Sequence, residues 1–375
     1  MPNAIILLCI TLLCPVAVAF IIAGSSSRAH QLEPLNYGLY EVQEEMLVRR
    51  GILEEELMAG NGKTLEANKP RGVGSSGGFG GSKGGSSVKS SSKDEGKAHA
   101  EVLREKGVVR IDGVLSNKVA DQMRDFVFDL RETATAEVEA GSAKLINRFA
   151  DVLLKSNRCD LTIPFGPEIV TKSLQQILAK SSVRDTIEEL LSPDAILYEL
   201  SCLISDPGSQ RQNVHPDNPF LDEMSNEPTL LTCFVALQDI DISMGPTVWI
   251  PGTHTKDVHE KFQDETPGYD GEESSKDRLL RTRPHVLGML KKGSCAIFDS
   301  RLLHCGSANR HEDISRALFY FSFKNPKVGY PGNPASIRRE IGAANLGLEQ
   351  LSQELEGCKG KKNSPALEAL AAQLK

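Results

Sequence analysis

Apolar residues along this chain follow two different spacings, one before and one after Ala195. Before Ala195 they recur every three or four positions, which predicts amphipathic helices. The predicted helices cover residues 101–105, 116–140, 168–180 and 184–191, and a short strand is predicted at 107–111. After Ala195 the apolar residues form short runs separated by Gly, Pro, Asn and Asp, which predicts strands. The predicted strands cover residues 196–204, 229–240, 247–250, 295–298 and 317–323.

Helices first and many short strands second predict a mainly β fold with flanking helices, built as a sandwich or barrel. Ser116 is a candidate N-cap of the long helix at 116–140. The polar stretch 265–283 interrupts the strand region. Two interpretations of it stay open, a mobile lid over a pocket and a plain surface insertion.

The first 23 residues predict entry into the secretory pathway. Residues 4–23 are almost all apolar, and Ala17-Val18-Ala19 fits the small-x-small pattern of a signal peptidase site. The segment is also long enough to anchor the protein in a bilayer, so the prediction is a signal peptide or a signal anchor. Both lead to the lumen of the endoplasmic reticulum or Golgi, or to secretion. The alternative is a plastid location, because Phe20 and the Gly-Ser-Ser-Ser-Arg that follows resemble a two-part plastid presequence.

Composition divides the rest of the chain into four parts. Residues 24–59 form an extension with one amphipathic helix, and residues 60–96 form a linker with eleven of the chain's 32 glycines. Because that run is rich in Gly, Ser and Lys and has no apolar period, it is expected to be disordered. A main domain follows at 97–335, and a tail with helical spacing covers 336–375.

Charge and cysteine content exclude several classes of protein. The formal net charge is −7, and residues 1–98 hold as many basic as acidic side chains, so the main domain and tail carry the whole excess. A mildly acidic domain lacks the basic surface of a nucleic-acid binder. The eight cysteines include no C-x-x-C pair and are too sparse for a disulfide scaffold. The expected partner is a small-molecule or lipid-like substrate, and the sequence does not indicate an oligomeric state.

The residues with the clearest chemistry are His215 and Asp217. On an extended segment, side chains two positions apart project to the same face, so one imidazole nitrogen and one carboxylate oxygen can reach one metal ion. A third ligand is then required. Five later histidines are candidates, namely His254, His259, His285, His304 and His311.

His304 is the best of these candidates because it follows an apolar strand and precedes a glycine. Arg316 opens the next predicted strand, and a hairpin between the two strands would bring its guanidinium near the metal. Two histidines and one carboxylate are the facial triad of non-haem Fe(II) oxygenases. The open positions of such an ion can hold 2-oxoglutarate and O₂, with Arg316 binding the far carboxylate.

Four further residues are candidates for the co-substrate site. Gln212 is placed either to hydrogen-bond near the metal or to fill a structural role. Asn309 and Ser315 either hold the turn before Arg316 or contact the co-substrate. Phe234, on the strand at 229–240, is the fourth.

Five ordered motifs resemble the phytanoyl-CoA dioxygenase family over roughly residues 100–340. They are Pro207-Gly-Ser-x-x-Gln-x-x-His-x-Asp217, Thr232-Cys-Phe-Val-Ala-Leu-Gln-Asp239, Gly245-Pro-Thr-Val-Trp-Ile-Pro-Gly-Thr-His254, Lys292-Gly-Ser-Cys-Ala-Ile-Phe-Asp299, and His304-x-Gly306 with Asn309 and Arg316. The resemblance implies a double-stranded β-helix, or jelly roll, with Fe(II) and 2-oxoglutarate. It assigns the iron to His215, Asp217 and His304, and the co-substrate to Arg316. Phe234 falls near a position that is often Trp in the family.

The prediction is therefore a dioxygenase that uses Fe(II), 2-oxoglutarate and O₂. It is expected to hydroxylate a C–H bond and to release succinate and CO₂. Asp217 favours hydroxylation, because the related halogenases have a small residue in place of this carboxylate. The alternatives are a non-catalytic jelly-roll metal-binding protein and a cupin-like metal-dependent hydrolase. A hydrolase has no need of a carboxylate-binding arginine, so Arg316 favours the oxygenase.

Overall fold

The computed structural model describes residues 91–150, 157–218, 220, 227–267, 269–327 and 336–357. The chain divides into two units at Leu53, and all these residues belong to the second unit. The predicted signal segment, the N-terminal helix, residues 60–90 of the linker and the last 18 residues lie outside them. Within the described part, none of the helices has the length and apolar character needed to cross a membrane.

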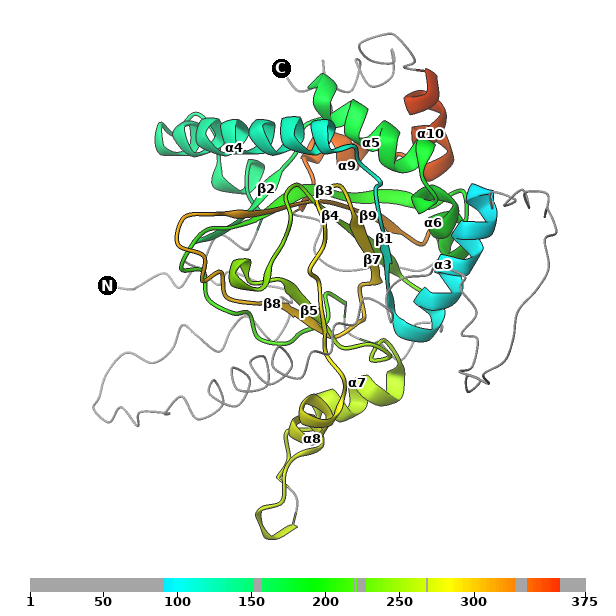
Figure 1. Ribbon diagram of the computed structural model, residues 1–375, viewed down its shortest axis with the longest axis vertical. Coiled ribbons are helices and arrows are strands. Elements are labelled where there is room, and N and C mark those ends of the chain that lie inside the picture. Colours follow the sequence, from blue (N-terminus) through cyan, green and yellow to red (C-terminus); the bar gives the residue numbers. More distant parts are fainter. Residues whose placement is uncertain are drawn as a thin grey trace, which may run out of the picture. The chain divides into compact units, whose positions relative to one another are not determined.

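Two antiparallel β-sheets form the centre of the domain and face each other (Figure 1). The large sheet has the strand order β1-β7-β4-β9-β3-β2, and the small sheet has the order β6-β5-β8. The strands of the large sheet are β1 (Val108–Ile111), β2 (Arg158–Thr162), β3 (Ile196–Ser205), β4 (Leu230–Ala236), β7 (Cys295–Asp299) and β9 (Arg316–Lys324). Those of the small sheet are β5 (Thr247–Trp249), β6 (Val286–Leu287) and β8 (His304–Gly306). This arrangement is a jelly roll with flanking helices, as predicted.

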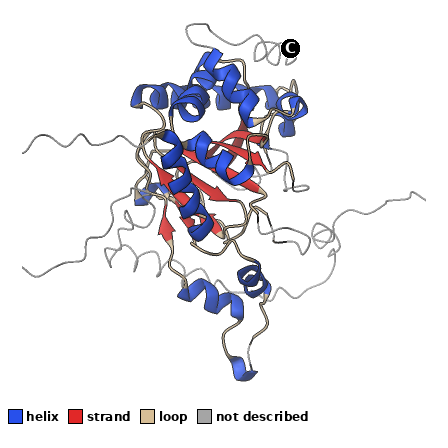
Figure 2. Cartoon of the chain, turned by 90° about the vertical axis from the view of Figure 1, so that its right-hand side faces the viewer, coloured by secondary structure: helices blue, strands red, loops and turns tan. Residues whose placement is uncertain are grey.

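A layer of helices covers the large sheet on the face away from the small sheet (Figures 1 and 2). Its members are α4 (Asn117–Glu139), α5 (Glu168–Lys180), α6 (Val183–Leu191), α9 (Arg339–Ala344) and α10 (Leu348–Gly357), while α3 (Ser92–Lys106) packs against α6. Helix α10 buries Leu348, Leu351 and Leu355 against this layer, so part of the predicted tail packs on the domain.

Strand β9 shows how the sequence separates the two faces of the large sheet. Phe319, Phe321 and Phe323 are fully buried in the core under the helices. Leu318 and Tyr320 point the other way and join a smaller core between the sheets. Successive side chains of a strand alternate in direction, so the even-numbered positions of β9 face the space between the sheets.

Several predicted boundaries differ from the structure. Helix α3 begins at Ser92, and Ser91 and Asp94 form a capping box, so residues 92–96, which were expected in the linker, are helical. Ser116 occupies the N-cap position of α4 but makes no side-chain capping bond. Strands β2, β6 and β8 were not predicted, because each is short and one mixes apolar with charged residues.

The polar stretch 265–283 contains helix α8 (Ser275–Thr282), which packs against α7 (Lys256–Gln263). This pair lies beyond the small sheet, at the end of the domain opposite the helical layer (Figure 1). The stretch is partly helical, which is compatible with both a lid and a plain surface insertion.

Candidate metal centre and active-site cavity

His215, Asp217 and His304 lie together between the two sheets. One ligand atom from each lies within 4.8 Å of the others. The Asp217 Oδ1 atom is 3.8 Å from His215 Nε2 and 3.5 Å from His304 Nε2. Among the described residues this is the one group of three metal-ligating side chains that could hold an ion. The candidates His254, His259, His285 and His311 are not part of it.

Backbone pairing brings the first two ligands to the third. His215 and His304 exchange two backbone hydrogen bonds of 2.9 Å, so the segment before Asp217 runs antiparallel to β8. The Asp217 amide donates to the Ser300 carbonyl in the turn between β7 and β8, at 2.8 Å. The segment that carries the His-x-Asp motif therefore pairs with the free edge of β8 and extends the small sheet there.

Hydrogen bonds to carbonyl oxygens set the tautomer of both histidines. The Nδ1 atom of His215 is 2.7 Å from the Asn213 carbonyl, and that of His304 is 2.9 Å from the Leu302 carbonyl. A carbonyl only accepts, so Nδ1 carries the proton and the unprotonated Nε2 of each ring points toward Asp217. This orientation is typical of histidines that bind a metal. The donor set thus fits an iron ion.

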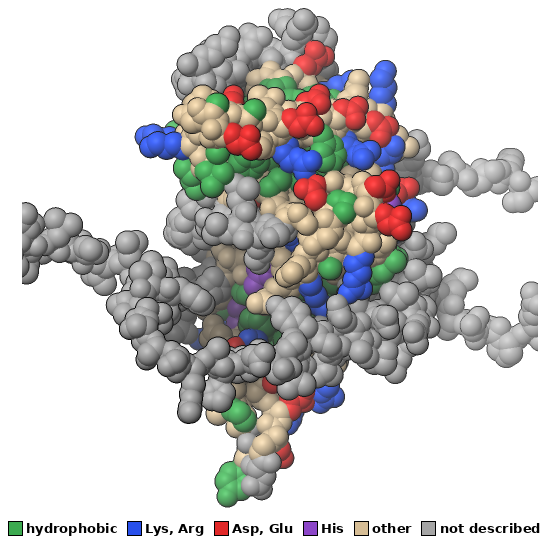
Figure 3. Space-filling model, turned by 90° about the vertical axis from the view of Figure 1, so that its left-hand side faces the viewer, with side chains coloured by type: hydrophobic (Ala, Val, Ile, Leu, Met, Phe, Trp, Pro, Cys, Tyr) green, Lys and Arg blue, Asp and Glu red, His purple; other side chains and the backbone are tan. Residues whose placement is uncertain are grey.

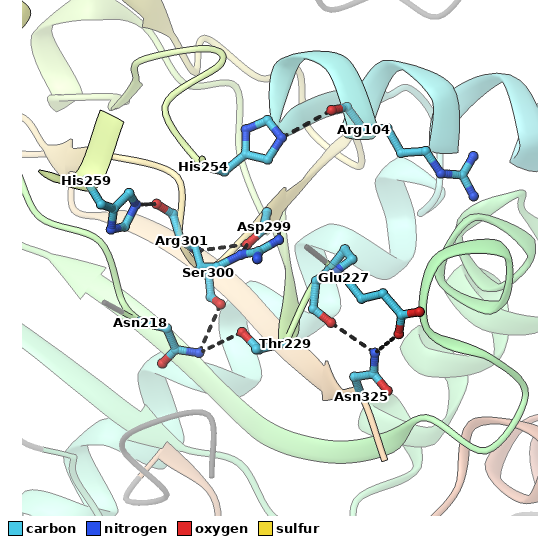
Figure 4. Close-up of polar contacts among 11 residues, drawn as sticks. Arg104, Asn218, Glu227, Thr229, His254, His259, Asp299, Ser300, Arg301 and Asn325 are labelled. Carbon is cyan, nitrogen blue, oxygen red and sulfur yellow. Dashed lines mark hydrogen bonds and ion pairs between the residues drawn. The ribbon is translucent and has the colours of Figure 1, made fainter. Parts of the chain in front are cut away.

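A buried polar network holds the β7–β8 turn against the ligand-bearing segment (Figure 4). Asn218, next to Asp217, donates to Ser300 Oγ at 3.1 Å and to Thr229 Oγ1 at 3.3 Å. Arg301 forms a buried ion pair of 2.7 Å with Asp299, and its carbonyl lies 2.7 Å from His259 Nε2. His259 therefore supports the turn between β7 and β8 and does not bind the metal.

The triad opens into a cavity of about 180 Å³ between the sheets. Figure 3 shows histidine side chains at the bottom of a hollow on this side of the molecule. The lining residues are Asp160, Glu199, Leu203, Gln212, His215, Asp217, Asn218, Leu230, Thr232, Phe234, Thr247, His304, Gly306, Tyr320 and Ser336. Among them, Phe234 and Gln212 were predicted near the site.

Gln212 and Phe234 have defined contacts at the cavity. Gln212 Oε1 accepts from the Gly306 amide at 2.9 Å, which fixes the ligand-bearing segment to β8. Phe234 forms one wall, edge-on to Phe298 and Tyr320. A Cβ atom on Gly306 would lie within 3 Å of Arg158 Nη1 and Gln212 Oε1, so a larger residue here would displace the ends of both side chains.

Arg316 is fully buried at the start of β9 but does not line the cavity. Its Nη1 donates to the Gly245 carbonyl and its Nη2 to Ser205 Oγ at 3.0 Å, while Nε has no partner. Burial, together with the charge of Arg158, lowers the pKa of Arg316 to about 9. A guanidinium still keeps its proton at neutral pH.

Arg158 is a second buried arginine beside Arg316, and the sequence did not single it out. It lies directly across β3 from Arg316, because both residues pair with Ser205. Its Nη2 donates to the carbonyls of Gln210 and Ser307, and its Nη1 has no partner. Neither arginine forms an ion pair with a described acidic residue. Two uncompensated guanidiniums fit the carboxylate of a co-substrate.

Asn309 and Ser315 have structural roles in the turn before Arg316. Asn309 Nδ2 donates to the carbonyls of Ser205 and Ile314, at 2.8 and 2.9 Å. Ser315 Oγ donates to Asp206 Oδ1 at 2.6 Å. Neither residue lines the cavity, so of the two interpretations left open by the sequence, the structure favours the turn.

Asp160 and Glu199 are two acidic residues of the cavity that the sequence did not predict as site residues. Asp160 is on β2, a strand that was not predicted, and Glu199 lies within an otherwise apolar strand. The signal that could have found them is a charged residue at an inward position of a buried strand. That signal appears only when the register of the sheet is known.

A jelly roll that holds two histidines and one carboxylate in a cavity between its sheets defines the class of mononuclear non-haem iron oxygenases. The family model for phytanoyl-CoA dioxygenase (PhyH) matches residues 103–317. The chain belongs to this family, as its five motifs predicted. Fe(II) and 2-oxoglutarate are the cofactor and co-substrate of the family, and the triad and the two buried arginines fit them.

Solved structures with a similar fold are distant in sequence. The chain is 18% identical to the non-heme alpha-ketoglutarate-dependent carbocyclase SnoK from nogalamycin biosynthesis, with a TM-score of 0.44. That match covers 60% of this chain and 83% of SnoK. HygX from Streptomyces hygroscopicus, with nickel and 2-oxoglutarate bound, is 14% identical with a TM-score of 0.41, covering 60% of this chain and 85% of HygX.

Proposed function

We propose that this protein is an Fe(II)- and 2-oxoglutarate-dependent dioxygenase that hydroxylates a C–H bond of a small-molecule or lipid-like substrate, with release of succinate and CO₂. The observation that carries the proposal is the triad, in which both histidines turn Nε2 toward Asp217 inside the cavity. Asp217 supplies the carboxylate that distinguishes a hydroxylase from the related halogenases. When bound, the iron supplies the site at which O₂ and 2-oxoglutarate react.

The residues of the chain bind and orient the reactants. His215, Asp217 and His304 would hold the ion and would leave coordination positions open for 2-oxoglutarate and O₂. Arg316, with Arg158 beside it, compensates the far carboxylate of 2-oxoglutarate. Arg316 Nε and Arg158 Nη1 have no partner in the described chain and are the donors available to that carboxylate.

The apolar part of the cavity excludes water from the reacting groups. Leu203, Leu230 and Phe234 line it, and Phe234 packs against further aromatic rings. Exclusion of bulk water would limit side reactions in the site. These side chains therefore favour reaction with the bound substrate.

The formation of succinate tests this proposal. Protein loaded with Fe(II) and 2-oxoglutarate without oxygen should form succinate and CO₂ when O₂ is admitted, even slowly and without substrate. Zinc in place of iron should give none. If the zinc form hydrolyses model esters or amides and the iron form makes no succinate, the cupin-like hydrolase is the correct function. If neither form turns over but both bind metal, the protein is a non-catalytic metal-binding jelly roll.

We also propose that the first 23 residues direct the protein into the secretory pathway. The apolar run at 4–23 and the small residues at Ala17 and Ala19 support this proposal. Edman sequencing of the protein from expressing cells tests it. A mature N-terminus near Phe20 indicates a cleaved signal, and an intact N-terminus in a membrane fraction indicates an anchor. Import into plastids with a second cleavage would contradict both.

A further inference from the structure

The space between the sheets has a basic end and an acidic end. Across the paired strands β2, β3 and β9, Arg158 and Arg316 flank Ser205 at one end. Side chains two positions apart on a strand lie on the same face of the sheet. Asp160 lies one step from Arg158, and Glu199 lies at the far end, paired with Ser322. The two arginines at one end and Glu199 at the far end thus face the same space, and Asp160 lies between them, one step from Arg158.

Asp160 is a buried carboxylate at the cavity wall, and one of its two oxygens has no hydrogen-bond partner. The side chain is 3% exposed. Its Oδ2 accepts from the Tyr320 hydroxyl at 2.7 Å and from Ser336 Oγ at 3.0 Å, while Oδ1 has no hydrogen-bond partner. Burial raises the pKa of this group to about 6, although the hydroxyls of Tyr320, Ser336 and Ser201 act against the rise. A buried carboxylate oxygen without a donor is costly unless something else occupies the site.

Glu199 adds a second carboxylate to the same wall. Burial is the largest cause that raises its pKa to about 8, and the charges of Asp217 and Asp160 add to the rise. No lysine or arginine is among the described residues that line the cavity. Three carboxylates, one of which belongs to the metal triad, therefore line this cavity, and no basic side chain is among the described residues that line it.

Thr232 gives an independent sign that a ligand belongs here. It lines the cavity, is 2% exposed, and its Oγ1 has no hydrogen-bond partner. Buried hydroxyls are almost always hydrogen-bonded in native proteins. Asp160 Oδ1 is thus an unsatisfied acceptor on the wall of this cavity, and Thr232 Oγ1 is an unpaired hydroxyl on the same wall that can accept a hydrogen bond from a ligand.

We propose that Asp160 and Glu199 bind a positively charged nitrogen of the substrate, an ammonium or guanidinium group. Thr232 Oγ1 accepts a hydrogen bond from one of the N–H groups of this nitrogen. This inference rests on the proposed function and assigns a substrate class to it. An ammonium group has three donors and no acceptor, which matches a wall that offers acceptors. A neutral hydroxyl would satisfy one oxygen but would leave the buried charge uncompensated.

The two arginines and the two acidic residues would then attract different reactants. The arginine end compensates the carboxylate of 2-oxoglutarate, and the acidic end repels it. The acidic end holds the cation, and the arginine end repels that group. Because the triad lines the same cavity as Asp160 and Glu199, the oxidised carbon is expected within a few bonds of the nitrogen.

Calorimetry with small probes tests the inference without knowledge of the natural substrate. The protein is loaded with Fe(II) and 2-oxoglutarate without oxygen and titrated with pentylamine and pentylguanidine. The neutral probe 1-pentanol and the anion hexanoate have similar chain lengths and serve as comparisons. Both cations should bind at least about tenfold more tightly than 1-pentanol. Hexanoate should not bind at the acidic end.

Variants then locate the bound cation. Glu199→Gln and Asp160→Asn keep the shape of each side chain and remove its charge, and each should weaken pentylamine binding about tenfold. Glu260→Gln, at an exposed position of α7, is the matched control and should leave binding unchanged. Thermal unfolding checks that each variant is folded, and the comparison of probes on the unaltered protein does not depend on any variant.

The outcomes separate this inference from the proposed function. If Fe(II) and 2-oxoglutarate bind but the cations bind no better than 1-pentanol, the cationic substrate is wrong and the oxygenase stands. If the cations bind and the two acidic variants lose that binding, the substrate class is supported. If the cations bind but Fe(II) with 2-oxoglutarate does not, the oxygenase is wrong and the acidic subsite stands. Equal loss in Glu260→Gln would also contradict the subsite.

Discussion

The two faces of the large sheet are built from the same strands and differ in almost every side chain. Toward the helices, β9 presents Phe319, Phe321 and Phe323, and the neighbouring strands add aliphatic residues and cysteines. Toward the small sheet, the same strand presents Arg316 and Tyr320, and β2 and β3 add Asp160 and Glu199. One face is a continuous apolar core, whereas the other mixes apolar walls with buried charge.

This difference shows how the fold divides stability from chemistry. Burial of apolar area stabilises the domain in proportion to that area, so the face under the helices contributes most of the folding free energy. Buried charged groups without partners oppose folding, so the inner face is tolerated only because the outer face is strongly stabilising. Substitutions on the outer face should therefore change stability, and substitutions on the inner face should change binding.

The largest effect is expected from Asp217→Ala on the inner side. It removes the only carboxylate of the triad and should reduce succinate formation to the background of metal-free protein, a loss of about 10³-fold or more. The melting temperature should change little, because Asp217 is 38% exposed. Succinate is measured by mass spectrometry and iron binding by titration without oxygen. Asp125→Ala, at an exposed position of α4, should leave both unchanged.

Phe321→Ala should give the largest effect on the outer face. The ring is fully buried between Phe319 and Phe323, and its loss leaves a cavity in the core. The expected cost is about 3–5 kcal/mol of unfolding free energy, measured by urea denaturation. Tyr320→Phe, one residue away on the inner face, should cost only about 1 kcal/mol because it removes a single hydroxyl. Equal costs at both positions would contradict the division between the faces.

The sequence predicted the outer face better than the inner one, for a physical reason. Apolar periods locate β3, β4, β7 and β9 within a few residues, because every second residue there is buried under helices. The triad was also predictable, since His215 and Asp217 are neighbours in sequence and His304 ends a recognisable motif. Asp160 and Arg158 lie on β2, whose assignment depends on pairing with β3, a contact that no local pattern records.

Asn218→Ala is expected to have a moderate effect that reaches the metal indirectly. The side chain donates to Ser300 and Thr229, and so holds the ligand-bearing segment against the β7–β8 turn (Figure 4). Loss of such support typically weakens metal binding about 10- to 100-fold. The dissociation constant of Fe(II), measured without oxygen, should rise by that factor, while bound iron should still support some succinate formation. A complete loss of turnover with unchanged iron binding would instead indicate a direct role in the reaction.

Glu199→Gln should have the smallest effect, and its sign depends on pH. Burial raises the pKa of this carboxyl to about 8 in the folded protein, against a value of 4.5 for an ordinary glutamate. Below pH 4.5 both states hold the proton, so the charge has no effect on stability. Between pH 4.5 and 8 the unfolded chain releases the proton while the folded chain retains it, so rising pH destabilises the fold.

Gln cannot ionise, so rising pH does not destabilise the variant through residue 199. In metal-free protein the variant should come close to the unaltered protein near pH 5 and exceed its unfolding free energy at pH 8. Urea denaturation at the two pH values measures the difference, with Glu260→Gln as the control that should show none. Saturating pentylamine should remove the advantage of the variant at pH 8, because the cation compensates the carboxylate in the unaltered protein. An equal change in stability at both pH values would show that Glu199 acts through its shape and not through its charge.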